Sequence, residues 1–338
     1  MTFVALCSQN RFGLPIVLQL LKKFFRKKTI CKGIIGISFL QNGIAVAVSK
    51  FTENNKLTLI HCEFIDAEEP AHQQDMLGEL ATRHNLAEYD CHLVLTSDNY
   101  RRVNVETPTV AENEILEAIR WKINELIDFP VDKAVIDYYQ TPMPVRANSS
   151  NMLEVIASPI DIIREQVEKC IKAGLQLKVI DIQETTLRNL AVHTPENERG
   201  IALLYLLEFS GTLLIQKEAT IYVSRKFEIG YKKLELDGPF SSESPAANAH
   251  NNLALEIQRS LDYVESYYGI SPISALAVIP LAENTHNLLD SLSRNLGIAA
   301  RIIDISTVID CDILVDAQTQ SLCAPVIGAT LRYVIEAA

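Results

Sequence analysis

Residues 33–48 read GIIGISFLQNGIAVAV. Two apolar runs flank the polar turn Gln41–Asn42–Gly43, a pattern that predicts a β-hairpin. A strand, a tight turn and a second strand at the start of a domain form the phosphate site of several nucleotide-binding folds. This hairpin has neither a carboxylate for a metal ion nor a second small residue where a phosphate would lie. We therefore expect it to be part of the architecture and not a phosphate site.

The rest of the chain alternates strands and helices. The hairpin is followed by a third strand at residues 57–65 and a helix at residues 73–86. From Gly200 the same pattern returns, with strands at residues 201–209 and within 211–230, and an amphipathic helix at residues 251–269. Three strands followed by a helix in both halves predict a duplicated α/β core.

Composition excludes several functional classes. The 338 residues are 48% apolar, which predicts two or more domains with real cores. The seven cysteines and seven histidines are scattered without CxxC or HExxH spacing, so we expect neither a disulfide framework nor a metal site. The net charge is −11, and an acidic body argues against nucleic acid as a partner.

The N-terminal leader, residues 1–32, has the opposite charge. The first 33 residues carry +7 and no acid, which leaves −18 for the remainder. Residues 14–28, LPIVLQLLKKFFRKK, have helical apolar periodicity but are too short and too charged to span a bilayer. One interpretation is a helix on an anionic membrane surface. The alternatives are a helix that docks its apolar face on the body, or a disordered leader. The membrane interpretation assigns the contact to Lys22, Lys23, Phe24, Phe25, Arg26, Lys27 and Lys28.

Four stretches, in order, resemble the PilM group of type IV pilus assembly proteins, and within it the branch that serves MSHA pili. They are ENEILEAIRWKINELIDFPVDKAVIDYYQTP (112–142), VIDIQETTLRNLA (179–191), LALEIQRSLDYVESYYG (253–269) and APVIGATLRYV (324–334). The first looks like the family's helix with a buried tryptophan and a proline, followed by a strand. The resemblance covers roughly residues 30–338.

The resemblance implies an actin-like, FtsA-related fold, which is a duplicated ribonuclease H-like α/β fold with an inserted α+β subdomain. The first half would be residues 33–199, including an insertion at about residues 86–178. The second half would be residues 200–338, with a closing helix that returns to the first half.

Against the family's nucleotide motifs this sequence is degenerate. In the first phosphate turn, Ser38 replaces the metal-linked aspartate and Leu40 replaces the glycine that lets the backbone approach phosphate. In the second turn Leu204 stands at the aspartate, and Ser210, Gly211 and Thr212 are either remnants or an ordinary hairpin turn. Pro280 and Leu281 occupy the paired glycines of the adenosine motif. We therefore expect no catalytic residue, no metal and no bound cofactor.

The resemblance implies a cytoplasmic scaffold at the inner membrane, not an enzyme. It would bind the cytoplasmic N-terminal tail of a PilN-like bitopic membrane protein, and other pilus assembly proteins. The tail would lie in a groove between the core and the insertion, lined partly by the helix around Trp121. The alternative for Trp121 is a core residue, which is the commoner role of a tryptophan at such a helical position. The alternatives are an ATP-binding protein that uses Ser38 and Thr212, with nucleotide gating the partner, and a filament former.

A pair of acidic residues and a set of three tyrosines also stand out in the sequence. Asp181 and Glu184 flank an expected helix start, and the helix dipole is sufficient to explain acids there. Tyr263, Tyr267 and Tyr268 recur at helical spacing and predict packing.

Overall fold

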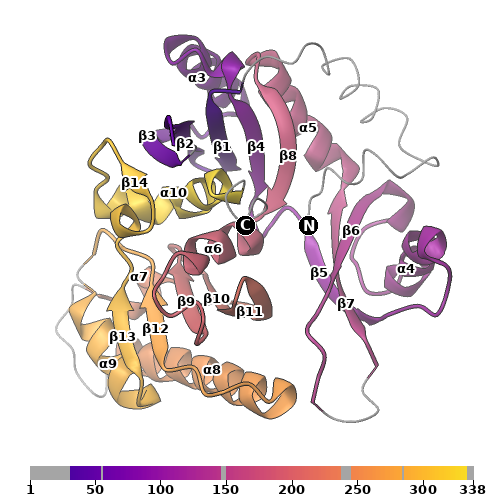
Figure 1. Cartoon of the computed structure of the whole chain (residues 1–338), viewed down its shortest axis with the longest axis vertical. Helices are drawn as coiled ribbons and strands as arrows, with labels where there is room; N and C mark the ends of the chain where they lie inside the picture. The colour runs from indigo at the N-terminus through magenta and orange to yellow at the C-terminus, as the bar shows by residue number, and fades with distance from the viewer. Residues whose placement is uncertain (1–30, 55, 146–149, 237–244, 284, 333–338) are drawn as a thin grey trace. The chain divides into compact units, whose positions relative to one another are not determined.

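The computed structural model describes residues 31–54, 56–145, 150–236, 245–283 and 285–332 (Figure 1). The leader therefore lies outside the described residues, apart from its last two positions. The chain divides into two compact units. The first contains Met1–Thr141, Ser150–Thr186 and Pro325–Ala338, and the second contains Pro142–Ser149 and Leu187–Ala324.

The hairpin quoted above forms the centre of the first unit's larger sheet. Its strands run in the order β3-β2-β1-β4-β8. Strand β1 pairs antiparallel with β2, from Gly33↔Lys50 to Leu40↔Gly43, and parallel with β4. The expected hairpin is confirmed. The strand bounds are β1 (Gly33–Leu40), β2 (Gly43–Phe51), β3 (Leu57–Asp66), β4 (Asp90–Leu95) and β8 (Gln176–Ile182).

Helices cover both faces of this sheet. On one face, α3 (Pro70–Arg83) and α5 (Ile160–Lys172) bury apolar side chains such as Leu77 and Val167 against β1, β4 and β8 (Figure 1). On the other face lies the end of α10 (Ala317–Thr330). It approaches β1 so closely that a Cβ atom at Gly36 would lie 2.2 Å from the Val326 carbonyl oxygen. Only glycine fits there without displacing backbone.

A separate three-stranded sheet forms the insertion. Its strands are β5 (Arg101–Glu106), β6 (Ala134–Gln140) and β7 (Met152–Pro159), in the antiparallel order β5-β7-β6, with helix α4 (Ile115–Ile123) against it (Figure 1). The insertion thus spans 101–159. The expected range of about 86–178 is too wide, because β4, α5 and β8 lie inside it yet belong to the larger sheet and its core.

The two faces of the inserted sheet have different neighbours. Val105, Leu153 and Val155 face α4, where they pack with Ile119 and Ile123. Because side chains alternate along a strand, the intervening residues face the other way. Those residues include Val135, Tyr139 and Ile156, which pack in the core of the larger sheet. Helix α4 and the larger sheet therefore lie on opposite faces of the inserted sheet.

The second unit repeats the plan of the first. Its sheet has the order β11-β10-β9-β12-β13, and α8 and α9 pack Leu253, Ile257 and Leu288 against it. Three antiparallel strands followed by helices occur in both units, so the expected duplication is confirmed. The bounds are β9 (Ile201–Leu206), β10 (Gly211–Lys217), β11 (Thr220–Phe227), α7 (Tyr231–Leu234), α8 (Pro245–Tyr268), β12 (Ala275–Val278), α9 (His286–Leu296), β13 (Ala299–Ile302) and β14 (Asp310–Cys311). Helix α6 (Gln183–Val192) contains residues of both units.

Candidate functional site

The hairpin residues that the resemblance assigns to the first phosphate turn form hydrogen bonds within the protein. Ser38 is buried, and its Oγ donates to the Val94 carbonyl oxygen of β4 at 2.9 Å. The Leu40 carbonyl accepts from Gln73 Nε2 of α3 at 2.9 Å, and the same amide donates to the Ala67 carbonyl at 3.0 Å. The Ser38 hydroxyl and the Leu40 carbonyl are thus engaged in hydrogen bonds within the protein.

A lysine supports this arrangement from α5. Lys169 Nζ donates to Gln73 Oε1 at 3.2 Å, pairs with Glu165 at 3.0 Å, and lies 4.9 Å from the centre of the Phe39 ring. Its buried charge is therefore compensated by a carboxylate, an amide and an aromatic face. Nothing in the sequence near the hairpin indicated Gln73 or Lys169, because they come from helices 30 or more residues away.

The corresponding positions of the second unit are also structural. Leu204 is fully buried in β9, and its carbonyl accepts the Ile279 N–H at 2.9 Å. Pro280 and Leu281 are buried directly after β12. Ser210 closes the turn between β9 and β10, where its carbonyl accepts the Leu207 N–H at 2.8 Å.

Trp121 has a different position from the expected one. Its side chain is 83% exposed, whereas Ile119 and Ile123 of the same helix are fully buried. It is therefore not a core residue. It also does not line a groove between the insertion and the core, because α4 covers the face of the inserted sheet that points away from the larger sheet. The side chain is accessible, and its contact with a partner stays a prediction.

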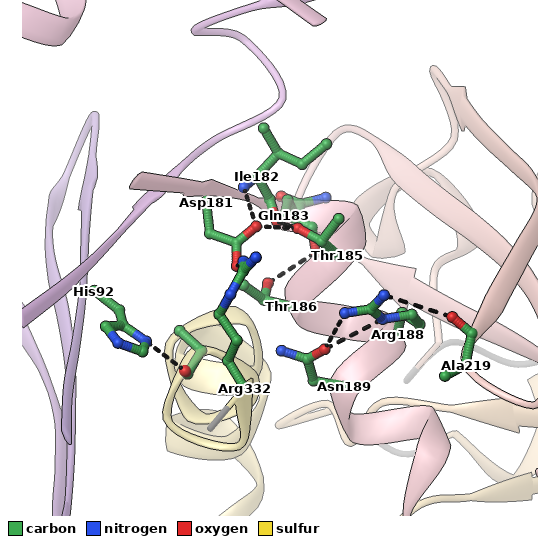
Figure 2. A network of polar contacts seen from close by, with 11 residues as sticks. His92, Asp181, Ile182, Gln183, Thr185, Thr186, Arg188, Asn189, Ala219 and Arg332 are labelled. Carbon is green, nitrogen blue, oxygen red and sulfur yellow. Dashed lines mark hydrogen bonds and ion pairs between the residues drawn. The ribbon is translucent and has the colours of Figure 1, made fainter. Parts of the chain in front are cut away.

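A buried ion pair joins Asp181 near the end of β8 to Arg332 just after α10 (Figure 2). Arg332 Nη1 donates to Asp181 Oδ2, and both side chains are buried. The other carboxylate oxygen of Asp181 accepts the Ile182 N–H at 3.0 Å and the Thr185 hydroxyl. Beside this pair, His92 Nδ1 donates to the Ala329 carbonyl at 2.9 Å, and burial lowers the pKa of His92. The ion pair, more than the helix dipole, compensates the charge of Asp181.

Glu184 ties the insertion to the start of α6. It accepts from the Tyr100 hydroxyl and from Arg102 Nη1 at 3.1 Å, and Arg102 Nε also donates to Glu154 Oε1 at 2.8 Å. All of these side chains are largely buried. Arg102 on β5 and Glu154 on β7 thus fix the core-facing side of the inserted sheet. Asp181 and Glu184 stand in arginine-centred networks, which their sequence positions did not reveal.

Asp137 of β6 makes folding depend on pH. Burial raises the pKa of Asp137 to about 6, with a further contribution from Asp181 that Arg332 opposes. A carboxyl whose pKa is higher in the folded than in the unfolded state stabilises the fold below about pH 4, and this stabilisation is lost as the pH rises through about 6.

We therefore predict that Asp137→Asn raises the free energy of unfolding at pH 8 and changes it much less at pH 4. The Tyr138 N–H, 2.9 Å from Asp137 Oδ1, keeps its acceptor in the variant. Urea denaturation of both proteins at the two pH values measures the difference. An equal effect at both pH values would contradict the burial argument.

Among the described residues, no group of histidine, cysteine, aspartate and glutamate side chains could hold a metal ion. In the same part of the chain, no helix has the length and apolar character needed to cross a membrane.

The comparison with known proteins gives matches in structure only. Neither a family model nor a curated protein matches the sequence. The chain is similar to the structure of a PilM–PilN type IV pilus biogenesis complex, with a TM-score of 0.66 and 17% identity over 90% of this chain and 98% of that one. A protein with an actin-like ATPase fold from Bacteroides thetaiotaomicron gives a TM-score of 0.51 and 9% identity over 88% of this chain and 96% of that one. With its duplicated sheets and inserted subdomain, this chain has an actin-like fold.

Proposed function

We propose that this protein is a non-enzymatic scaffold of a type IV pilus assembly machine or of a related secretion system. The observation that carries the proposal is the likeness to the structure of the PilM–PilN complex across 90% of the chain. The four sequence stretches described above support the PilM group, and within it the MSHA pilus protein MshI.

The described contacts support a scaffold without ATPase activity. An actin-like ATPase needs a carboxylate to orient Mg²⁺ and water, and a backbone that can approach phosphate. Here Ser38 and Leu40 stand at those positions, and their polar groups are bonded to Val94 and Gln73.

The proposed partner is the cytoplasmic N-terminal tail of a PilN-like bitopic membrane protein. In the order β5-β7-β6, strands β5 and β6 are the outer strands of the described sheet. An extended tail pairs with such an edge through backbone hydrogen bonds, and apolar side chains supply the specificity. We place the tail at this sheet and not at Trp121.

We further propose that the leader holds the protein at the cytoplasmic face of the inner membrane. It carries five basic residues between Lys22 and Lys28, and each adds about 1 kcal/mol of attraction to anionic lipid. Two weak attachments, one to lipid and one to the tail, together give stable recruitment.

The decisive experiment is a calorimetric titration of the full chain with a synthetic peptide of a PilN-like cytoplasmic tail from the same organism. We expect saturable binding to the wild type, and binding at least tenfold weaker after Asn104→Pro. Asn104 is exposed on the outer strand β5, and proline removes its backbone N–H. Thr82→Pro in the last turn of α3, away from the insertion, is the matched control for backbone damage. A peptide that releases no heat would overturn the assignment.

A second titration of the same protein sample uses Mg²⁺-ATP up to 1 mM. We predict no saturable heat, because the turn groups are already hydrogen-bonded to protein atoms. Saturable binding would favour the alternative function, in which bound nucleotide gates the partner. The tail titration on the same sample shows that the protein is competent to bind.

A further inference from the structure

Helix α4 and its flanking turns present an exposed tryptophan among carboxylates. Glu117 lies four residues before Trp121 on α4 and so shares its side of the helix. Glu114 and Glu125 lie in the turns directly before and after α4. All three glutamates are exposed. Leu126 beside them is 56% exposed. We call these five residues the acidic tryptophan face.

The charge of this surface is only partly neutralised by ion pairs, such as the one between Arg101 and Asp128 at 2.7 Å. Residues 106–132 contain seven acids and two bases, a net charge of −5. Both bases are bonded to backbone carbonyls: Arg120 Nη1 to Val131 at 2.9 Å, and Lys122 Nζ to Glu106 at 3.0 Å. Within the described part of the chain, Glu114 and Glu125 form no ion pair. An exposed tryptophan beside unpaired carboxylates suits a ligand that carries both cations and apolar side chains.

The chain itself contains a segment with this chemistry. The leader carries Lys22, Lys23, Arg26, Lys27 and Lys28 in seven residues, with Phe24 and Phe25 between them. We infer that residues 14–28 of one copy dock on the acidic tryptophan face of a second copy. The basic residues supply charge that complements the glutamates, and the phenylalanines supply apolar groups that complement Trp121 and Leu126. This inference does not depend on the pilus function proposed above.

The connection to β1 favours a second copy over the chain's own leader. The Lys32 N–H donates to the Glu88 carbonyl at 3.1 Å, so the leader leaves the sheet beside the start of β4. The insertion leaves from the far end of β4, about 17 Å away for a strand of this length. Residues 29–32 reach about 13 Å when extended, and Trp121 lies beyond the inserted sheet. If residues 14–28 dock as one segment, its end at Lys28 in the same copy therefore has too short a connection to reach the acidic tryptophan face.

The contact joins two different surfaces, so two copies that exchange leaders form a closed dimer, whereas contacts in one direction build rings or open chains. Anionic lipid needs the same basic residues. A membrane surface should therefore release the leader from the neighbouring copy and separate the copies.

The single tryptophan of the chain makes the contact directly measurable. We expect the emission maximum of the full chain to shift to the blue as protein concentration rises, and to return in 1 M salt or with excess phosphatidylglycerol vesicles. Two variants should abolish the shift. One carries Lys22→Glu, Lys23→Glu and Arg26→Glu in the leader, and the other carries Glu114→Gln, Glu117→Gln and Glu125→Gln in α4 and its flanking turns. The matched control removes the same charge from exposed sites near α3, with Glu68→Gln, Glu69→Gln and Glu79→Gln.

A second arm tests recognition without the chain's own leader. A synthetic peptide of residues 14–28, which contains no tryptophan, is titrated into the full chain that carries the charge-reversed leader. We expect a saturable blue shift, with binding at least tenfold weaker when the three glutamates of the acidic tryptophan face are glutamines. An emission that responds neither to concentration nor to the peptide would overturn the inference. A blue-shifted emission that persists at every dilution and is lost on charge reversal would also overturn it, because the leader would then dock in its own copy.

Discussion

Replacing Asp181 with alanine is expected to lower the free energy of unfolding by about 3–5 kcal/mol. The carboxylate and its partner Arg332 are both buried, at 4% and 3% side-chain exposure. Removing the carboxylate leaves the guanidinium buried without its counter-charge, and it also removes the acceptor of the Ile182 N–H and the Thr185 hydroxyl. Urea denaturation followed by far-ultraviolet circular dichroism measures the loss.

The double variant Asp181→Leu with Arg332→Met separates the ion pair from the packing. It removes both charges and keeps apolar volume, so we expect it to be more stable than Asp181→Ala alone. A double variant that is no more stable than Asp181→Ala would show that the stability comes from the hydrogen bonds of Asp181 and not from charge compensation.

Gly36→Ala is expected to destabilise the protein by about 2–3 kcal/mol, although it adds a single methyl group. The new Cβ would lie 2.2 Å from the Val326 carbonyl oxygen and 3.2 Å from the Val326 Cα. Because both atoms belong to backbone, the end of α10 must move away from β1. That movement also stretches the hydrogen bonds that Ala329 and Thr330 form with His92 and Ser49, each 2.9 Å long.

Gly78→Ala in α3 is the matched control. A Cβ at Gly78 meets no heavy atom within 4 Å, and the position is inside a helix. Alanine has the higher helix propensity, so the variant should gain about 0.5–1 kcal/mol. Equal effects of the two substitutions on the urea midpoint would contradict the close approach of α10 to β1.

Local patterns of the sequence predicted the parts of the fold that depend on neighbouring residues. The two apolar runs around Gln41–Asn42–Gly43 specify a hairpin, because strand pairing across a two-residue turn involves residues close in sequence. The tyrosines at helical spacing on α8 are a packing cluster, as expected, with the rings of Tyr263 and Tyr267 stacked at 4.9 Å between centres.

The sequence could not predict which sheet an apolar strand joins. Strands β4 and β8 have the same apolar character whether they belong to the insertion or to the larger sheet. Their partners, such as Ile34 for Asp90, lie more than 50 residues away. For the same reason the sequence favours a buried Trp121, whereas in the structure Ile119 and Ile123 of α4 pack against the inserted sheet.

The sequence by itself determined the strand and helix pattern, the duplication and the contrast between a basic leader and an acidic body, since each of these follows from residue type and spacing. Only the tertiary structure decided that Ser38 bonds to Val94, that Gly36 faces Val326 and that Asp181 pairs with Arg332. The physical reason is that burial and charge compensation are properties of neighbours in space. In these pairs the neighbours are separated by between 56 and 290 residues of chain.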